Sequence, residues 1–377
     1  MFPYFIMVGI PAYLSILFQY SEIKQCKIAG YELDLMKRRN YRIVIDVFFI
    51  IWLLLLAFRS ETVGSDLVIY KYHFNRYANM SWDYIMSNNI LSQHDPAYVL
   101  LCKIVSNYTN NFQWVVVISA LISVLPIWKL YRNDGQNGFL TIVLFLNIAP
   151  FVMYFSGLRQ AMAMAFSVPC YYYCRDKKLL KFLLMIVFAY HFHKSSLVLL
   201  LMYPTYHIHW RKKIHLFYLL PIIAVVYVLK IQIFSFLLLF MNDMYIERYG
   251  DGIKLTGAIS VLLLLIVLLL YSFLIVDQEK LDRDTLGLRN LLVLSVLLQI
   301  FSGAHTIAMR MNYYYLLFIP LLMDRVIKIG NEREEKILKL SKICMLAFFT
   351  FYYFYSAYTD ANKLNVYPYS FFWENVL

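Results

Sequence analysis

The chain has 377 residues, of which 61% are hydrophobic and only 15% are charged. A soluble domain carries about 25% charged residues, so this composition excludes an ordinary soluble globular protein. The formal net charge of +12 does not indicate a nucleic-acid partner, because the basic residues lie in loops between hydrophobic segments. The five cysteines are scattered and complete no zinc-binding set, so we interpret them as small apolar residues.

Hydrophobic segments recur along the whole chain, and each is near the ~20 residues that a helix needs to cross a bilayer. We therefore predict an all-α polytopic membrane protein with about 12 transmembrane helices, forming a single transmembrane domain over residues 1–377. The predicted spans are 2–20, 43–58, 112–130, 138–155, 159–174, 179–193, 195–206, 214–231, 256–276, 287–304, 312–328 and 341–359.

Three apolar segments differ from an ordinary internal span. Residues 1–20 lack a basic region and a small-residue cleavage site, so we expect a first span rather than a cleaved signal. Residues 195–206 are short for a full crossing and are expected to be tilted or re-entrant. Residues 96–109 are apolar but interrupted, which predicts an interfacial helix.

The orientation follows from the loops between the spans. Of the 35 Lys and Arg residues, 24 lie in six alternate loops. By the positive-inside rule these loops face the cytosol, and twelve spans then place both termini outside. Two longer segments lie on the outer side, at residues 59–95 and 232–255.

The first outer loop begins with Arg59 and Glu61 and continues with the sequence GSDLVIY. Asp66 follows a Gly-Ser turn and precedes Tyr70, which makes it a candidate acid or base for activating a hydroxyl. The alternative is an Asx-type turn residue. The aromatic residues of this loop are candidates for stacking on sugar rings or for an interfacial aromatic belt.

Arg159 lies in the sequence FSGLRQAMAMAF, at the outer start of a predicted helix. A helix N-terminus exposes free N–H groups, and an arginine adds a planar fork of donors suited to phosphate. The sequence therefore predicts an anion site here. Arg310, also at the outer start of a span, is a candidate second clamp. For both residues the alternative is interfacial anchoring, and Arg159 could instead pair with a carboxylate.

The histidines and acidic residues elsewhere in the chain are weaker candidates for a functional role. His191 and His193 point to different faces of a helix, so they do not form a zinc pair. One of them is a candidate for bonding a sugar or carrying a proton, with an interfacial histidine as the alternative. The sequence DRD at 282–284 is interpreted as a solvated loop. We expect no metal site.

At residues 155–204 the sequence resembles the EpsG family of bacterial membrane proteins, which includes Wzy-like polymerases of O-antigen, capsule and exopolysaccharide. The resemblance is carried by LRQ after an outer turn, a basic inner loop and an A-x-x-x-H-x-S pattern. Two flanking patterns also match, one early and one late in the chain. The residues involved are Leu158, Arg159, Gln160, Lys177, Lys178, Ala189, His193, Ser195, then Arg59, Gly64, Ser65, Asp66, Tyr70, and finally Arg310, Met311 and Tyr313. The family often has Thr at or near the position of Val68, so the early pattern is the looser match.

The resemblance implies a GT-C-like fold and a polymerase in the bacterial inner membrane. Such an enzyme moves a glycan from undecaprenyl diphosphate to the next lipid-linked repeat unit at the outer face, without a cofactor or nucleotide sugar. A chain-length regulator is an implied protein partner. Within this scheme Asp66, Arg159, His193 and Arg310 would be catalytic. The substrate-binding residues would be Arg59, Tyr70, Gln160 and Tyr313.

Two other functions remain open. A flippase for lipid-linked oligosaccharides is expected to place charges deep within its spans, whereas here the notable charges cluster at one face. A membrane glycan O-acyltransferase requires a catalytic histidine, for which His193 is a candidate.

Overall fold

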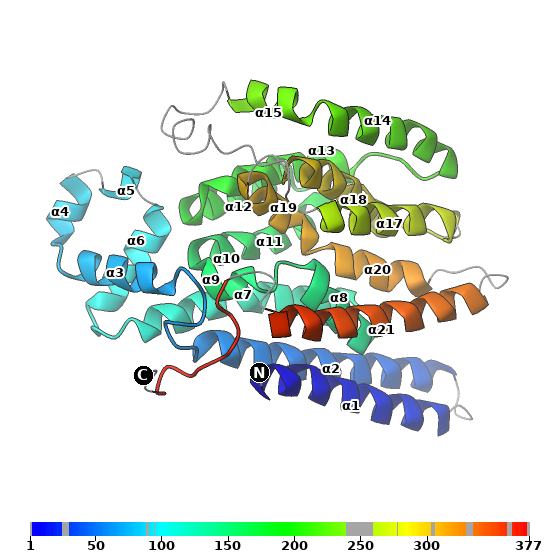
Figure 1. Cartoon of the computed structure of the whole chain (residues 1–377), viewed down its shortest axis with the longest axis horizontal. Coiled ribbons are helices and arrows are strands. Elements are labelled where there is room, and N and C mark those ends of the chain that lie inside the picture. Colours follow the sequence, from blue (N-terminus) through cyan, green and yellow to red (C-terminus); the bar gives the residue numbers. More distant parts are fainter. Residues whose placement is uncertain are drawn as a thin grey trace. The chain divides into compact units, whose positions relative to one another are not determined.

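The computed structural model describes residues 2–24, 30–87, 90–93, 95–238, 259–276, 278–302, 306–328, 335–359 and 364–374. Within these ranges the chain is helical and has no strand, which confirms the predicted all-α class (Figure 1). The chain divides into two compact units, Met1–Leu197 with Ile343–Leu377, and Val198–Lys342. The single transmembrane domain stays a prediction.

Three long helices dominate the first unit: α1 (Phe2–Lys24), α2 (Gly30–Ala57) and α7 (Gln113–Asp134). Helix α7 runs antiparallel to α2. At one end the Gln113 side chain donates a hydrogen bond to the carbonyl of Ala57 at 2.6 Å, and at the other Arg132 pairs with Asp46 at 2.8 Å. The two helices therefore pack side by side in opposite directions, with a polar contact at each end of α7.

Helix α2 begins earlier than the sequence predicts. Residues 30–42 were expected in a basic loop but form the first turns of the helix. Leu, Met, Lys, Arg and Glu all have good helix propensity, so this polar segment continues the helix instead of ending it. The change in polarity near residue 43 thus marks a change of surroundings along one helix.

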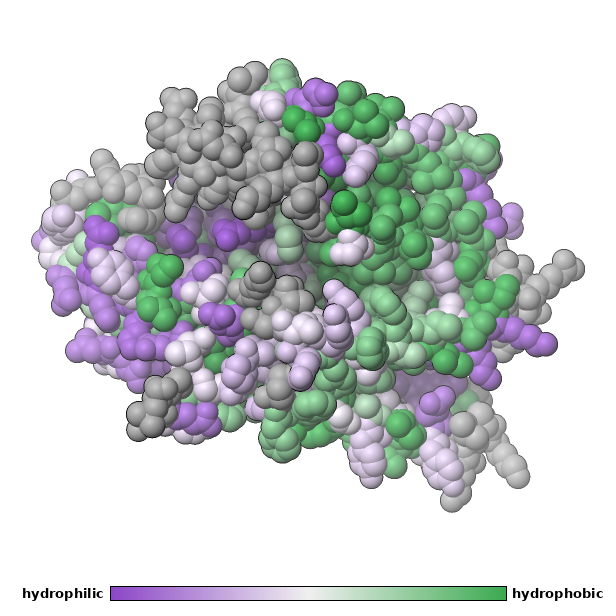
Figure 2. Space-filling view, in the orientation of Figure 1, coloured by the Kyte–Doolittle hydropathy of each residue, from purple (hydrophilic) through white to green (hydrophobic). Residues whose placement is uncertain are grey.

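The first outer loop, residues 59–95, folds into α3 (Leu67–Ala78), α4 (Trp82–Ser87) and α5 (Ile90–Gln93) and is followed by α6 (Pro96–Ser106). These helices gather at the end of the unit where α2 ends (Figure 1). Their visible surface is largely hydrophilic (Figure 2). They enclose an apolar cluster with residues of α7 and α10, made of Leu67, Tyr70, Phe74, Tyr77, Ile85, Ile90, Tyr98, Val99, Cys102, Val105, Phe112, Val115, Val116, Leu158 and Met162.

Two predicted spans of the first unit are broken into shorter helices. Residues 138–155 form α8 (Gly138–Ile148) and α9 (Met153–Ser156), and residues 159–174 form α10 (Leu158–Ala165) and α11 (Ser167–Arg175). The first break occurs because the residue before Pro150 is driven to an extended conformation. The second occurs near Pro169, which has no N–H to donate to the carbonyl four residues earlier. Helix α12 (Leu179–Phe192) follows as predicted.

Similar breaks occur later in the chain. Residues 195–206 form a 3-10 helix, η1 (Lys194–Leu201), and the short α13 (Met202–Tyr206). The predicted span 312–328 is divided at residues 317–318, just before Pro320. The remaining helices are η2 (Lys213–His215), α14 (Leu216–Val228), α15 (Lys230–Leu238), α17 (Ile259–Leu274), α18 (Arg283–Ser302), α19 (Thr306–Leu316), α20 (Ile319–Lys328) and α21 (Glu335–Thr359).

Among the described residues, five helices are long and apolar enough to cross a membrane, and a sixth crossing results if α14 and α15, bent by 70°, form one span. The five are Phe2–Glu22, Leu33–Ala57, Gln113–Asp134, Arg283–Ser302 and Lys336–Thr359. Large apolar side chains such as Ile16, Leu180 and Phe217 are exposed, which is typical of helices that face lipid. The chain is therefore a multi-pass membrane protein, whereas 12 crossings and a GT-C-like arrangement stay predictions.

The DRD sequence at 282–284 was expected to be a solvated loop, and Asp282 and Arg283 are indeed exposed, but Arg283 and Asp284 belong to α18. Asp282 accepts a hydrogen bond from the backbone N–H of Thr285 at 2.8 Å, so it caps the start of α18. Asp284 forms an ion pair with Arg325 at 2.6 Å, and its side chain is only 17% exposed. The two carboxylates therefore fix helices within the second unit.

Candidate functional site

The structure brings together two motifs that are about 90 residues apart in the chain. The turn at Gly64 packs directly on the backbone of Phe155 and Ser156, and the Ser65 and Ser156 hydroxyls lie 2.8 Å apart. Gly64 has φ +106°, and a Cβ at this position would lie 2.0 Å from the carbonyl oxygen of Phe155. Only glycine allows this contact, which sets Asp66 beside the start of α10.

Arg159 is the second residue of α10 and lies at the centre of the site. Its Nη1 forms an ion pair with Asp95 at 2.8 Å, and its guanidinium lies 5.5 Å from the centre of the Tyr70 ring. The Arg159 side chain is 35% exposed, so one edge of it reaches the surface. Its Nε is buried and has no hydrogen-bond partner among the described residues. Arg159 is thus held by a carboxylate and an aromatic ring, with donor capacity left over.

Asp95 is a residue of this site that was not among the candidates predicted from the sequence. It precedes Pro96 at the start of α6, and its side chain is 11% exposed. Burial raises the pKa of the Asp95 carboxyl, while the charges of Arg159 and Lys194 act in the opposite direction. An acidic residue followed by proline is a helix-start signal that could have drawn attention to it. The Asp95 side chain makes no capping bond, however, and serves Arg159 instead.

Asp66 occupies the N-cap position of α3 but does not cap it with its side chain. Its carboxylate accepts a hydrogen bond from the Ser65 hydroxyl at 3.0 Å and is half-buried. Tyr70, one turn later, is buried and packs edge-on against Tyr98, with ring centres 5.3 Å apart. Asp66 therefore lies at the surface of the site, whereas Tyr70 lies beneath Arg159 as its support.

Arg59, a candidate substrate-binding residue, is 1% exposed. Its guanidinium donates to the carbonyl of Leu56 and lies 5.8 Å from the ring centre of Phe155. Its Nε and Nη2 are buried without a hydrogen-bond partner among the residues described. Burial lowers the pKa of the Arg59 guanidinium to about 10. These contacts place Arg59 under the turn at Phe155, as a positioning residue rather than a surface contact.

Two other candidates lie in the first unit. Gln160 is 1% exposed and belongs to the buried face of α10. His193 ends α12, and its Nδ1 lies 3.0 Å from the Ser195 hydroxyl. Its neighbour Phe192 packs against the apolar cluster, and the charge of Lys194 acts on Asp95. His193 is therefore at the edge of the site that contains Arg159.

Arg310 and Tyr313 belong to α19 in the second unit. Arg310 is exposed, and Tyr313 lies three residues later on the same face of the helix. Because each unit is described by itself, a joint clamp by Arg159 and Arg310 stays a prediction. His305 and most of the outer segment 232–255 lie outside the described residues.

The C-terminal segment, residues 364–374, completes the outer turn after α2. Gly64 N donates to the carbonyl of Asn365 at 3.0 Å, and Ser65 N donates to that of Leu364 at 2.9 Å. A further bond joins Ser60 N to the carbonyl of Ser370 at 2.9 Å. No residue pattern in the sequence indicates this pairing, because backbone hydrogen bonds leave no signature in side-chain chemistry.

The aromatic residues expected to contact sugars divide into two groups. Tyr70 and Tyr77 are buried in the apolar cluster, which argues against direct stacking on a ligand. Tyr72, Trp82 and Tyr84 are exposed, so they remain candidates. No group of three or more His, Cys, Asp or Glu residues suited to a metal ion is found in the described part of the chain.

One comparison with known proteins gives a match. The model of the EpsG family matches residues 42–371, a range that contains both motifs of the site, Asp95 and most of the C-terminal segment. No curated protein and no solved structure gives a significant match. A match over most of the chain identifies the family, and membership suggests a polysaccharide polymerase type of function. The chain belongs to the EpsG family.

Proposed function

We propose that the protein is a Wzy-type glycosyltransferase of the bacterial inner membrane. It would transfer a growing glycan from undecaprenyl diphosphate to an incoming lipid-linked repeat unit at the outer face, in the synthesis of O-antigen, capsule or exopolysaccharide. The observation that carries the proposal is the placement of Asp66 and Arg159 on adjoining turns, joined through the Ser65–Ser156 contact. A base and an anion-binding group at one place suit the transfer of a group between a hydroxyl and a diphosphate.

In the proposed reaction the acceptor hydroxyl oxygen forms a bond to the anomeric carbon of the donor glycan. The bond between that carbon and the diphosphate oxygen breaks, and the diphosphate leaves with the electron pair. The hydroxyl proton passes to the Asp66 carboxylate, with His193 as the alternative acceptor. No nucleotide sugar or cofactor is needed.

Arg159 would stabilise the charge that develops on the leaving diphosphate. Asp95 and Tyr70 fix the guanidinium before substrate arrives, so little reorganisation is required during the reaction. The Arg159 side chain is 35% exposed, so its exposed edge would meet the diphosphate. Arg310 would assist from the second unit, and Tyr313 would contribute to the substrate site. Gln160, which is 1% exposed, would support α10 from within and not contact the substrate. A chain-length regulator remains the expected protein partner.

A flippase and an O-acyltransferase are less well supported. Asp66 and Asp95 lie at the starts of α3 and α6, among helices whose visible surface is largely hydrophilic, and Asp95 pairs with Arg159 there. A flippase would instead be expected to place its charges along a path through the spans. His193 lies beside Ser195, at the edge of the site that contains Arg159, so it is better placed to assist Arg159 than to serve a separate acyl transfer. The polymerase is therefore the function that these residues support best.

The test is reconstitution of the full-length protein with a purified lipid-diphosphate-linked repeat unit. The wild type is expected to give a ladder of glycan lengths. Arg159→Ala is expected to reduce product about 10²- to 10³-fold, the usual loss when a group that stabilises transition-state charge is removed. Arg76→Ala, which changes an exposed arginine at the end of α3, is the matched control and should retain the ladder. A normal ladder from Arg159→Ala would refute the proposal.

A further inference from the structure

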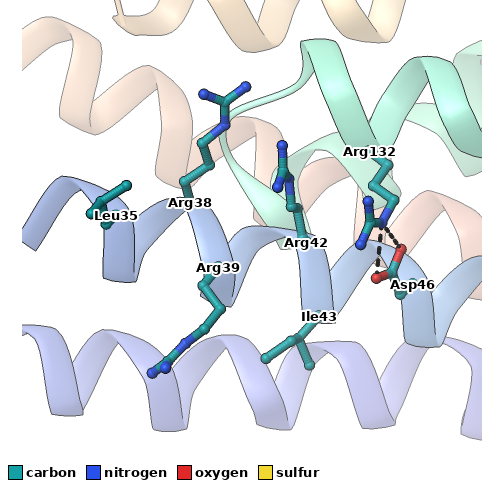
Figure 3. A pocket seen from close by; sticks show the side chains of 7 residues that line it. All are labelled: Leu35, Arg38, Arg39, Arg42, Ile43, Asp46 and Arg132. Atoms are coloured by element: carbon teal, nitrogen blue, oxygen red, sulfur yellow. Dashed lines mark hydrogen bonds and ion pairs between the residues drawn. The ribbon is translucent and has the colours of Figure 1, made fainter.

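A second basic site lies at the opposite end of α2 from Asp66, between α2 and α7 (Figure 3). Its lining comprises Leu35, Arg38, Arg39, Arg42, Ile43, Asp46 and Arg132, around a pocket of about 250 Å³. Four arginines and one carboxylate give this lining a net charge of +3. Nothing in the proposed reaction uses this pocket, because Arg59 and Asp66 lie beyond the far end of α2.

The one carboxylate of the pocket is already occupied. Asp46 accepts bonds from Arg132 Nε at 2.8 and 3.1 Å, and from the Trp128 indole N–H at 2.7 Å. It therefore neutralises Arg132 and leaves Arg38 and Arg42 without an acidic partner among the described residues. Arg42 Nε is buried and has no hydrogen-bond partner in the described part of the chain. A buried, unpaired donor of this kind is costly unless an acceptor fills the site.

Two arginines of α2, Arg38 and Arg42, also lie on the same face of the helix. Arg38, Arg42 and Asp46 recur every four residues, so they form one stripe along α2. In Figure 3 the side chains of Arg38 and Arg42 extend to the side of α2 on which Arg132 lies, whereas Arg39 extends to the opposite side. Arg38, Arg42 and Arg132 thus line the pocket from one side of α2. Lys37, an exposed residue of α2 that is not among the lining residues, provides a control.

The position of the pocket suggests where its ligand comes from. Apolar residues follow Arg42 almost without interruption to the end of α2, so the guanidinium groups lie where the helix changes from polar to apolar surroundings. Guanidinium forks match the oxygens of a phosphate, and basic pockets between membrane helices bind the head groups of anionic lipids. We propose that Arg38, Arg42 and Arg132 form a phosphate site that holds the head group of an anionic phospholipid.

The test measures lipid retention by the purified full-length protein with native mass spectrometry. Phosphatidylglycerol is expected to remain bound after delipidation, whereas phosphatidylcholine, which has the same phosphate but no net charge, is lost. Arg42→Gln and Arg38→Gln should each weaken retention of phosphatidylglycerol by about tenfold, the effect of losing one charge-assisted bond. Lys37→Gln, which removes an exposed cation of α2 outside the pocket lining, should have no effect. Equal weakening by Lys37→Gln would show general attraction to a charged surface and would overturn the proposal.

A second measurement distinguishes the lipid from a soluble ligand. Inorganic phosphate should displace phosphatidylglycerol from the wild type at millimolar concentration and should bind Arg42→Gln about tenfold more weakly. Binding of phosphate without any retention of phosphatidylglycerol would overturn the lipid assignment. Arg38 is exposed, so Arg38→Gln keeps the test decisive if Arg42→Gln does not fold.

Discussion

At the residue scale, the site depends on how one cation is held. Arg159 is neither a free surface arginine nor one that extends to lipid head groups, because Asp95 and Tyr70 fix it from two sides. The interpretation from sequence allowed pairing with a carboxylate as an alternative to an anion site. The structure contains that pair and still leaves Arg159 partly exposed, so the two roles are compatible.

Replacing Asp95 tests whether the ion pair positions Arg159. In Asp95→Asn the guanidinium keeps its charge but loses its fixed partner, so kcat is expected to fall about tenfold while KM for the lipid-linked donor does not rise. Steady-state kinetics on the reconstituted protein gives both constants. An unchanged kcat with a lower KM would mean that Asp95 only competes with the substrate for Arg159.

Asp66→Asn tests the proposed base. The amide cannot accept the hydroxyl proton, so kcat should fall about 10²- to 10⁴-fold with donor binding preserved. Single-turnover measurements separate the chemical step from binding. If affinity and turnover fall together, Asp66 positions the substrate and His193 becomes the candidate base.

At the element scale, the turns decide the geometry more than the helices do. The turn at Gly64 joins α2 to α3, contacts the backbone before α10 and is bonded to the C-terminal segment. Pro150, Pro169 and Pro320 lie at or near breaks that divide three predicted spans into shorter helices. Short helices and tight turns in one place are what allow Arg159 to pair with Asp95 and the turn before Asp66 to contact the start of α10.

Gly64→Ala is the test at this scale. The added Cβ would lie 2.0 Å from the Phe155 carbonyl oxygen, and φ of +106° is strained for alanine. We expect a loss of about 1–3 kcal/mol in stability, measured as a lower thermal unfolding temperature in detergent, together with a loss of activity. Gly9→Ala is the control, because a Cβ there meets nothing within 4 Å. Wild-type stability and activity in Gly64→Ala would contradict the role of this turn.

At the scale of the whole molecule, the proposed function requires that the site with Asp66 and Arg159 faces the outside of the membrane. The distribution of Lys and Arg predicts that Ser65 faces outside and Lys280 faces the cytosol. Single cysteines at these two exposed positions, in a background without the native cysteines, can be labelled with a membrane-impermeant reagent. Only the cysteine at position 65 should react in intact cells. Labelling of both would contradict the proposed orientation.

The sequence by itself determined the all-α class, the membrane setting and the residues of the two motifs, because hydropathy and helix propensity are local properties of a chain. It also indicated Arg159 and Asp66 from their residue types beside glycine turns. Only the tertiary structure decided that Asp95 pairs with Arg159, that Arg59 and Tyr70 are buried, and that residues 364–374 bond to the turn at Gly64. These outcomes depend on segments that meet only after the chain reverses direction, and no local pattern records which segments will meet.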